Sequence, residues 1–235
     1  MTVAKTRDKT GAKTRARTND RARETKSIAE KRKDPTKRGP TASVRAAHDD
    51  REVMALKLKP APLSPAMADL FKLCQEKLGF VPNVFKAFSF DMTKLEGFVG
   101  YRNSVMQGES GLSKVEQEMI ATAVSTQNRC YYCVTSHGSA VRGLSGDPIL
   151  GEQIVMNYRA ADLDKRQRAM LDFVVKLTVE PWTIEESDRE GLRRAGFSDR
   201  DIWDIAAIAG FFNMTNRIAS AIDMRPNSQY HAMGR

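Results

Sequence analysis

The chain has 235 residues, of which 41% are hydrophobic and 29% are charged. These values are ordinary for a soluble protein, and the length suits one medium-sized domain with a buried core. The net charge of +9 comes almost entirely from residues 1–52, which hold 16 Lys or Arg and 8 Asp or Glu. The rest of the chain is nearly neutral, so the charge of the folded part does not indicate a nucleic-acid-binding surface.

Residues 1–52 have the composition of an unstructured segment. They contain no Tyr, Phe or Trp and almost no large aliphatic residues, so they cannot bury enough apolar surface to offset the entropy of ordering. We predict a disordered basic tail over 1–52 and a folded domain over 53–235. A solvated extension is favoured over an arm that binds nucleic acid, because acidic residues interrupt every basic run.

From about residue 53 the sequence predicts helices joined by short loops. Ser64 and Pro65 have the pattern of an N-cap and a first helical position, and Gly79 that of a helix end. Ser113 and Glu116 have the spacing of a capping box at the start of a later helix. Further helices are expected at 85–89, 91–106, 132–142, 148–157, 164–177, 183–195 and 198–222. No segment alternates as a strand does, so the predicted fold class is all-α.

The helix that begins at Ser113 has a counterpart 85 residues later. At this offset Ser113, Glu116, Ile120, Ala121 and Asn128 align with Ser198, Asp201, Ile205, Ala206 and Asn213. An internal duplication of a helical unit would produce this match. At the same offset Cys130, Cys133 and His137 align with Thr215, Ile218 and Ile222. Only the first copy would therefore carry chemistry.

The segment Cys130-Tyr-Tyr-Cys133-Val-Thr-Ser-His137 has the strongest chemical signal in the chain. Cysteines three residues apart can share a helical face, and a helix N-terminus lowers a thiol pKa and raises the reactive thiolate fraction. His137 lies one turn beyond Cys133, where its imidazole can take the thiol proton as a general base. Glu118, twelve residues before Cys130, is a candidate to orient the imidazole or to pass protons.

The cellular compartment bears on this motif. No run approaches the roughly 18 apolar residues of a membrane-spanning helix. The basic N-terminus is followed by no apolar stretch, so we expect no secretory signal and a cytoplasmic location. In a reducing cytosol a structural disulfide is disfavoured, and a C-x-x-C pair indicates catalysis or metal binding.

Other sites that these residues could build meet specific objections. The two cysteines, His137 and Glu118 have the ligand types of zinc, but structural zinc sites usually add a distant C-x-x-C or H-x-x-x-H, which this chain lacks. An iron–sulfur cluster needs about four thiolates, and only Cys74 remains. Haem attachment requires His directly after the second cysteine, where Val134 stands. Redox chemistry is favoured, and no metal is expected.

Several other residues are assigned to packing. Cys74 lies on an apolar helical face, and Trp182 and Trp203 are expected to anchor the core. The segment 211–217 is expected to pack as a helix with an internal salt bridge. This interpretation is preferred over a substrate-binding role for its polar residues Asn213, Asn216 and Arg217.

The pattern Glu118, eleven residues, Cys130-x-x-Cys133-x-x-x-His137 resembles the AhpD-like alkylhydroperoxidases of the carboxymuconolactone decarboxylase superfamily. Within it the chain resembles the branch of uncharacterised peroxidase-related enzymes over residues 56–235, the tail excluded. The segments that carry this resemblance are Leu78-Gly-Phe-Val-Pro-Asn-Val-Phe85, Lys114-Val-Glu-Gln-Glu-Met-Ile-Ala121, Phe211-Phe-Asn213 with Asn216-Arg217, and Tyr230-His-Ala-Met-Gly-Arg235.

The resemblance implies an all-α fold of repeated helical units that forms a homo-oligomer. It implies that Cys133 is the thiol that attacks peroxide and Cys130 the resolving thiol. His137 and Glu118 would form the proton relay. AhpD proper has a histidine between the cysteines where this chain has Tyr132, a departure that bears on proton transfer and peroxide activity. Carboxymuconolactone decarboxylases lack the dithiol, so decarboxylation is not expected.

The predicted function is thiol-dependent reduction of an alkyl hydroperoxide in antioxidant defence. The reductant would be an external dithiol, a role that lipoylated proteins hold in the AhpD family. No Gly-rich dinucleotide fingerprint occurs, so no flavin or nicotinamide cofactor is expected. Two alternatives stay open. One is a dithiol–disulfide oxidoreductase or redox adaptor that never meets peroxide, and the other is a non-enzymatic redox sensor whose tail binds nucleic acid.

Overall fold

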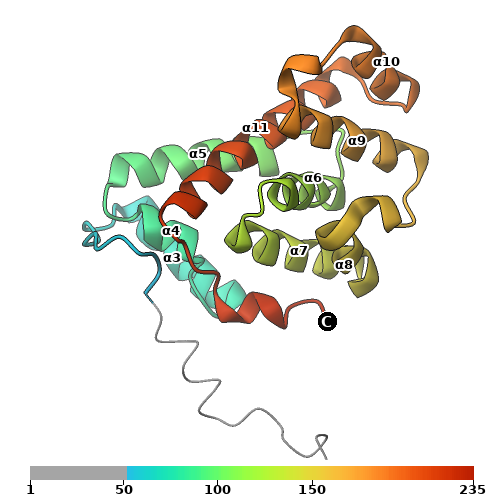
Figure 1. Cartoon of the computed structure of the whole chain (residues 1–235). Coiled ribbons are helices and arrows are strands. Elements are labelled where there is room, and N and C mark those ends of the chain that lie inside the picture. Colours follow the sequence, from blue (N-terminus) through green and yellow to red (C-terminus); the bar gives the residue numbers. More distant parts are fainter. Residues whose placement is uncertain (1–51) are drawn as a thin grey trace, which may run out of the picture. The chain divides into compact units, whose positions relative to one another are not determined.

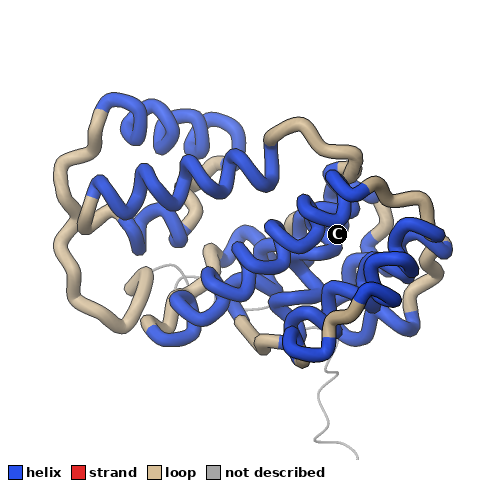
Figure 2. The backbone as a smooth tube through the Cα atoms, turned by 90° about the horizontal axis from the view of Figure 1, so that it is seen from above, coloured by secondary structure: helices blue, strands red, loops and turns tan. Residues whose placement is uncertain are grey.

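The structure is a computed structural model that describes residues 52–235 (Figure 1). Within this range the chain is helical and has no strand, which confirms the predicted all-α class (Figure 2). The helices are α3 (Pro65–Leu78), α4 (Asn83–Phe88), α5 (Met92–Gln107), α6 (Lys114–Gln127), α7 (Tyr131–Ser145), α8 (Pro148–Asn157), α9 (Lys165–Val179), α10 (Glu186–Arg194) and α11 (Asp199–Ala221). The basic tail predicted to be disordered covers residues 1–52, and residues 1–51 of it lie outside the described part.

The centre of the domain is α6, which packs against α7, α8, α9 and α11 (Figure 1). Nearly every residue of its middle turns is buried, from Met119 to Ser125. A helix that is buried on all sides needs an apolar or small side chain at almost every position, and this segment supplies them. Thr122 and Ser125 are also buried there, and each hydroxyl donates to the carbonyl one turn earlier. The central position of α6 matters for function because its carboxyl end leads directly into α7.

The predicted helix ends are largely confirmed. Gly79 ends α3 in the left-handed conformation, with φ of 78°, which only glycine adopts without a steric cost. Ser113 and Glu116 form the predicted capping box at the start of α6. Ser64 is the N-cap residue of α3, but its hydroxyl makes no cap bond and donates instead to the Glu96 carboxylate at 2.6 Å.

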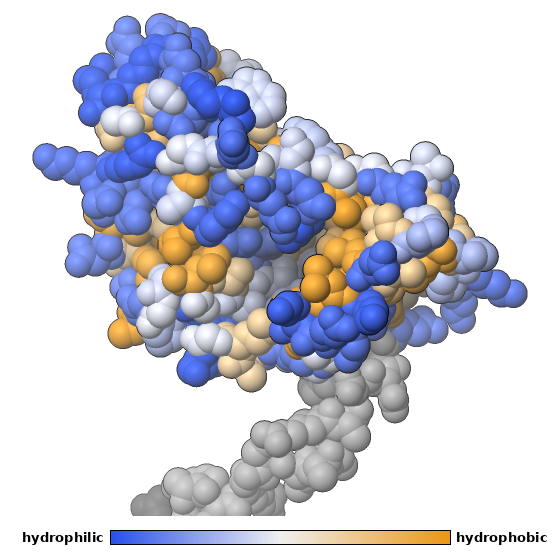
Figure 3. Space-filling model, turned by 180° about the vertical axis from the view of Figure 1, so that it is seen from behind, coloured by the Kyte–Doolittle hydropathy of each residue, from blue (hydrophilic) through white to orange (hydrophobic). Residues whose placement is uncertain are grey.

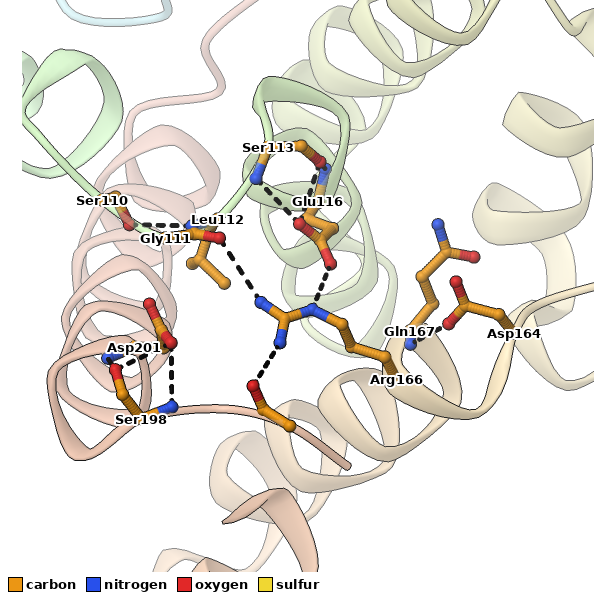
Figure 4. Close-up of polar contacts among 11 residues, drawn as sticks. Ser110, Gly111, Leu112, Ser113, Glu116, Asp164, Arg166, Gln167, Ser198 and Asp201 are labelled. Carbon is orange, nitrogen blue, oxygen red and sulfur yellow. Dashed lines mark hydrogen bonds and ion pairs between the residues drawn. The ribbon is translucent and has the colours of Figure 1, made fainter. Parts of the chain in front are cut away.

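The counterpart of this start lies at α11, where Ser198 and Asp201 form a second capping box. Arg166 of α9 links the two helix starts (Figure 4). Its Nε donates to the Glu116 carboxylate at 3.1 Å, and its Nη1 donates to the carbonyl of Gly196 at 2.8 Å. At the other end of the pair, Asn128 donates to Asn213, its aligned residue, at 3.0 Å. The aligned residues of α6 and α11 thus face each other.

Two predictions about large side chains are wrong. Trp182 is 79% exposed and Trp203 is 61% exposed, so neither anchors the core. Trp182 lies in a short 3-10 turn between α9 and α10, and Trp203 lies on the outer face of α11, because Ile202 and Ile205 occupy the inner face. The internal salt bridge predicted in 211–217 is also absent, since the Arg217 guanidinium donates to the backbone carbonyl and side chain of Asn213.

Apolar side chains reach the surface in several patches among charged residues (Figure 3). Ile149 and Met156 of α8 are the most exposed aliphatic side chains of the described residues. None of the described helices combines the length and hydropathy that a membrane span requires.

Candidate active site

The dithiol segment follows a sharp break between two packed helices. Asn128 ends α6, and Arg129 adopts a left-handed conformation with φ of 52°. The amide of Cys130 then donates back to the carbonyl of Ser125 at 3.0 Å, and Cys130 becomes the N-cap residue of α7. A left-handed residue other than glycine costs about 1 kcal/mol or more. This turn places Cys130 and Cys133 in the first turn of a new helix, as the sequence predicted.

Both sulfurs are buried, and they have different surroundings. Cys130 is 1% exposed and Cys133 is 4% exposed, and neither forms a disulfide in this structure. Cys130 lies in a small apolar cluster with Met54, Ala219 and Met224. Cys133 also contacts this cluster, but in addition it borders an internal cavity. Of the two thiols, Cys133 alone lines that cavity.

The cavity has a volume of about 420 Å³, within the range of about 300–1,000 Å³ that is common for small-molecule sites. Its walls come from α3, α4, α5, α6, α7, α11 and the C-terminal segment. Most of the lining is aliphatic or aromatic, including Leu70, Leu73, Leu78, Phe98, Phe211 and Phe212. Near Cys133 the lining turns polar, with His137 and Glu118.

His137 and Glu118 form the short pair that their spacing suggested. The Nδ1 atom of His137, on α7, lies 2.6 Å from a carboxylate oxygen of Glu118, on α6. The imidazole also packs edge-on against Phe212, with ring centroids 4.5 Å apart. Because the carboxylate accepts the Nδ1 proton, Nε2 is the ring atom that can accept a further proton. The structure therefore brings Cys133, His137 and Glu118 to one cavity.

The pKa values of the two thiols are shifted in opposite directions. The pKa of Cys130 is lowered to about 6, chiefly because the Cys133 thiol donates a hydrogen bond to its sulfur, while burial opposes the shift. The backbone amide of Cys133 and the side chain of Ser220 also donate hydrogen bonds that lower it. The pKa of Cys133 is raised well above its usual value by the bond to Cys130 and by burial. The resting pair is therefore a Cys130 thiolate with a protonated Cys133.

Two further residues contact the Cys133 sulfur, and sequence reasoning did not single them out for this role. The polar side chains of Asn216 and Ser125 lower the pKa of Cys133, against the larger effects that raise it. Asn216 is buried, its carbonyl oxygen accepts from Asn128 at 2.9 Å and its amide donates to Ser125 at 3.0 Å. The sequence signal is an amide in an otherwise apolar stretch of α11, a pattern that by itself favours helix packing.

Comparison with known proteins identifies the family. A model of the carboxymuconolactone decarboxylase family matches residues 95–149. An uncharacterized peroxidase-related protein from Silicibacter sp. TM1040 is 57% identical, with a TM-score of 0.76, and the match covers 79% of this chain and 97% of that chain. The alkylhydroperoxidase AhpD core, an uncharacterized peroxidase-related protein from Ralstonia eutropha JMP134, is 40% identical, with a TM-score of 0.76 and coverage of 79% and 98%. This chain belongs to the AhpD-like peroxidase-related proteins of the carboxymuconolactone decarboxylase superfamily.

The AhpD-like fold carries more than one chemistry. The debrominase Bmp8, solved as a cysteine-to-alanine variant in complex with 2,3,4-tribromopyrrole, has the same fold, with 19% identity, a TM-score of 0.65 and coverage of 77% and 97%. At that identity the likeness shows the fold alone. No protein of curated function matches this chain. The reaction of this AhpD-like protein must therefore be argued from its own site.

Tyr132, the departure from AhpD proper, is buried beside the cavity. Its hydroxyl accepts from the Val84 amide at 3.1 Å and donates to the Tyr230 hydroxyl. Burial raises the pKa of Tyr132 well above 10 and that of Tyr230 to about 12. This AhpD-like site therefore has a neutral hydrogen-bonded pair where AhpD proper has an imidazole. The pair can orient a ligand but does not exchange protons near neutral pH.

The C-terminal segment closes one side of the AhpD-like site through a residue that sequence reasoning missed. Arg142 of α7 is buried, and its guanidinium donates to the carbonyls of Met233 and Tyr230, each at 3.1 Å. These bonds hold Tyr230 and Met233 on the cavity wall. The only sequence signal was a basic residue in a helix whose neighbours are small, and its partners lie about 90 residues away. Among residues 52–235 no three His, Cys, Asp or Glu side chains cluster as a metal site.

Proposed function

We propose that this AhpD-like protein reduces organic hydroperoxides with its dithiol, as part of antioxidant defence. The observation that carries the proposal is that Cys133 alone of the pair borders the cavity, next to the His137–Glu118 pair. A small substrate in the cavity meets the Cys133 thiol and a proton acceptor, and the Cys130 thiol lies behind Cys133, outside the lining. These are the parts that reduction of an O–O bond by thiols requires.

The proposed reaction begins with ionisation of Cys133. The Cys133 proton leaves its hydrogen bond to the Cys130 sulfur and passes to Nε2 of His137, while Glu118 stabilises the imidazolium that results. The Cys133 thiolate attacks one oxygen of the hydroperoxide, and the O–O bond breaks. The alkoxide that leaves takes the proton from His137 and departs as an alcohol. Cys133 is left as a sulfenic acid, so the peroxide has been reduced by two electrons.

The second half of the reaction uses Cys130. Its thiolate attacks the sulfur of the Cys133 sulfenic acid, which forms a disulfide and breaks the S–O bond. The hydroxide that leaves takes a proton from the solvent and becomes water. Because Cys130 is a thiolate with a pKa of about 6, it is ready for this step without a further base. An external dithiol then reduces the disulfide by exchange.

The burial of the sulfurs restricts the reductant. With Cys130 1% and Cys133 4% exposed, a folded protein thiol cannot reach either sulfur without a rearrangement. A slender dithiol, such as a lipoyl group on a flexible arm, can enter through the cavity. The same burial argues against the alternative function, a dithiol–disulfide oxidoreductase for protein substrates. It favours a small oxidant instead.

The proposal is tested by following the consumption of cumene hydroperoxide with dihydrolipoamide as the donor. We expect turnover in the natural protein, only the uncatalysed background in Cys133→Ser, and a single turnover at most in Cys130→Ser. A sulfenic-acid trap should label Cys133 in the Cys130→Ser protein. The Cys74→Ser protein is the matched control, because it removes a thiol from the same cavity and should keep its turnover.

Two outcomes separate the proposal from its rivals. Turnover that persists in both Cys130→Ser and Cys133→Ser would rule out the dithiol mechanism. Reduction of a small disulfide by the natural protein, without peroxide consumption and without a trapped sulfenic acid, would favour the oxidoreductase alternative. We also propose, from the family resemblance, that the chain forms a homo-oligomer, which light scattering can test. The cytoplasmic location expected from the sequence can be tested by cell fractionation.

A further inference from the structure

The cavity contains a cationic feature that peroxide reduction does not use. Arg102 of α5 and Lys77 of α3 both line it. Arg102 is partly buried and Lys77 is exposed, so the guanidinium lies within the wall and the ammonium at the rim. The mechanism proposed above assigns neither residue a role.

Arg102 and Lys77 have no carboxylate partner within residues 52–235, where neither forms an ion pair. The hydrogen bond of the Arg102 guanidinium goes to the neutral side chain of Asn103, at 2.9 Å. The cavity has one carboxylate in its lining, Glu118, which is already held by His137 at 2.6 Å. Because a charge that leaves water is stabilised by an opposite charge, a partly buried cation without an anion can hold an anionic ligand.

The positive charge of Arg102 acts on groups in two other walls of the cavity. It counteracts the rise in pKa that burial causes at Cys74 of α3, and it acts in the same sense on Tyr230 of the C-terminal segment. These groups belong to separate walls, and both line the cavity. On α5, Phe98, Arg102 and Met106 are spaced by one turn and all line the cavity. The guanidinium therefore interrupts an apolar helical face that is directed inward.

The apolar part of the lining continues from this cation to the thiol. Leu70, Leu73 and Leu78 line the cavity from α3, and Leu73 and Leu78 stay 49% and 40% exposed. Phe211 and Phe212 continue the apolar wall to His137. A ligand that fits this arrangement has a negative group at one end and an apolar body that reaches toward the sulfur.

We propose that the substrate is an amphipathic organic acid hydroperoxide, and that Arg102, assisted by Lys77, binds its carboxylate. The inference rests on the proposed function, because it names the class of peroxide that the same site reduces. The carboxylate takes no part in the chemistry. It anchors the molecule while the hydroperoxide group is reduced to an alcohol at Cys133. A planar guanidinium suits a carboxylate because it can donate two parallel hydrogen bonds.

Binding of an acid that cannot react tests the site without peroxide chemistry. The probes are decanoate and its neutral analogue decanamide, measured by calorimetry on the reduced full-length protein. We expect decanoate to bind the natural protein and to lose about ten- to a hundred-fold in affinity in Arg102→Gln, the cost of one charged hydrogen-bonded contact. Decanamide should bind both proteins alike. Arg102→Lys should recover part of the loss.

The matched control is Arg189→Gln on α10, a partly buried arginine whose partner is Glu186 and which does not line the cavity. It should bind decanoate as the natural protein does. Equal decanoate affinity in Arg102→Gln and the natural protein would overturn the inference, as would decanamide binding as tightly as decanoate. Circular dichroism on each variant shows that a loss of affinity is not a loss of fold.

A kinetic experiment separates this inference from the proposed function. The substrates are linoleic acid hydroperoxide and its methyl ester. We expect Arg102→Gln to raise KM for the acid and to leave kinetics with the ester unchanged. If neither is reduced but decanoate binds through Arg102, the proposed function fails and the carboxylate site stands. If cumene hydroperoxide is reduced but the affinity for decanoate does not depend on Arg102, the carboxylate site is refuted and the proposed function stands.

Discussion

The helices α6 and α11 begin alike and end alike, but only one of them leads to reactive groups. Each starts with a Ser and acidic capping box, and Arg166 connects the two starts (Figure 4). Each also ends with a left-handed residue, Arg129 with φ of 52° and Asp223 with φ of 49°. The amide of the next residue then donates to a carbonyl five residues back in both cases.

The difference is length. The first helix has 14 residues and the second has 23. Because α6 stops early, a new helix N-terminus forms at Cys130, while the aligned Thr215 lies inside the unbroken α11. A helix N-terminus stabilises a thiolate, and the interior of a helix does not. The position of the break therefore decides where the reactive thiols lie, and the starts of the two helices contribute scaffold.

The largest expected effect comes from replacing His137 by the residue type that stands at its aligned position, 85 residues later. His137 aligns with Ile222, so His137→Ile removes the proton acceptor and leaves an apolar side chain beside Phe212. We expect kcat/KM for hydroperoxide to fall about 10²- to 10⁴-fold, the usual contribution of a general base. His137→Gln should fall by a similar factor. Stopped-flow measurement of peroxide consumption gives the value, and a fall of less than about threefold would contradict the relay.

The second prediction concerns the thiolate that the break creates. The pKa of Cys130 is lowered from 9.0 to about 6. Between pH 6 and 9 the Cys130 thiol has therefore lost its proton in the folded reduced protein and keeps it in the unfolded chain. The stability of the reduced protein should therefore increase as pH rises from 6 to 9 and fall as pH decreases through 6. Thiolate absorbance should show a transition near pH 6.

The control for this titration is Cys130→Ser, which should lose both the transition near pH 6 and the associated gain in stability. The raised pKa of Cys133 contributes only above this window. A single thiolate transition near pH 9 in the natural protein would mean that the placing of Cys133 beside Cys130 at this helix start does not lower the pKa of Cys130. It would also remove the functional meaning of the break.

The sequence allowed much of this arrangement to be predicted, for physical reasons that are local. The capping box at Ser113, the helix end at Gly79 and the C-x-x-C at the start of α7 are set by residues within one or two turns. The exposure of Trp203 could not be predicted, because it depends on which face of α11 meets α6 and α9. The same holds for Asn216 and Arg142, whose partners are separated from them in sequence by about 90 residues.

The third prediction concerns the break directly. A β-branched side chain in the left-handed conformation clashes with its own backbone, so Arg129→Val should lower the free energy of unfolding by about 1–2 kcal/mol. Asp223→Val should lower it by a similar amount. Only Arg129→Val should also lower kcat/KM, because the turn it distorts places Cys130 and Cys133. Urea unfolding and peroxide turnover on both variants give the comparison, with Arg129→Gly as the variant that should keep full activity.

The smallest expected effects are at the two helix starts, where the comparison predicts equality. The hydroxyl of Ser113 accepts from the Glu116 amide at 3.2 Å, and that of Ser198 accepts from the Asp201 amide at 3.1 Å. Ser113→Ala and Ser198→Ala should each lower the free energy of unfolding by about 1 kcal/mol. Both should leave kcat/KM unchanged, since neither cap touches the cavity. A loss of activity in Ser113→Ala alone would show that the start of α6, as well as its end, positions Glu118. The two helix starts would then not be equivalent parts of the scaffold.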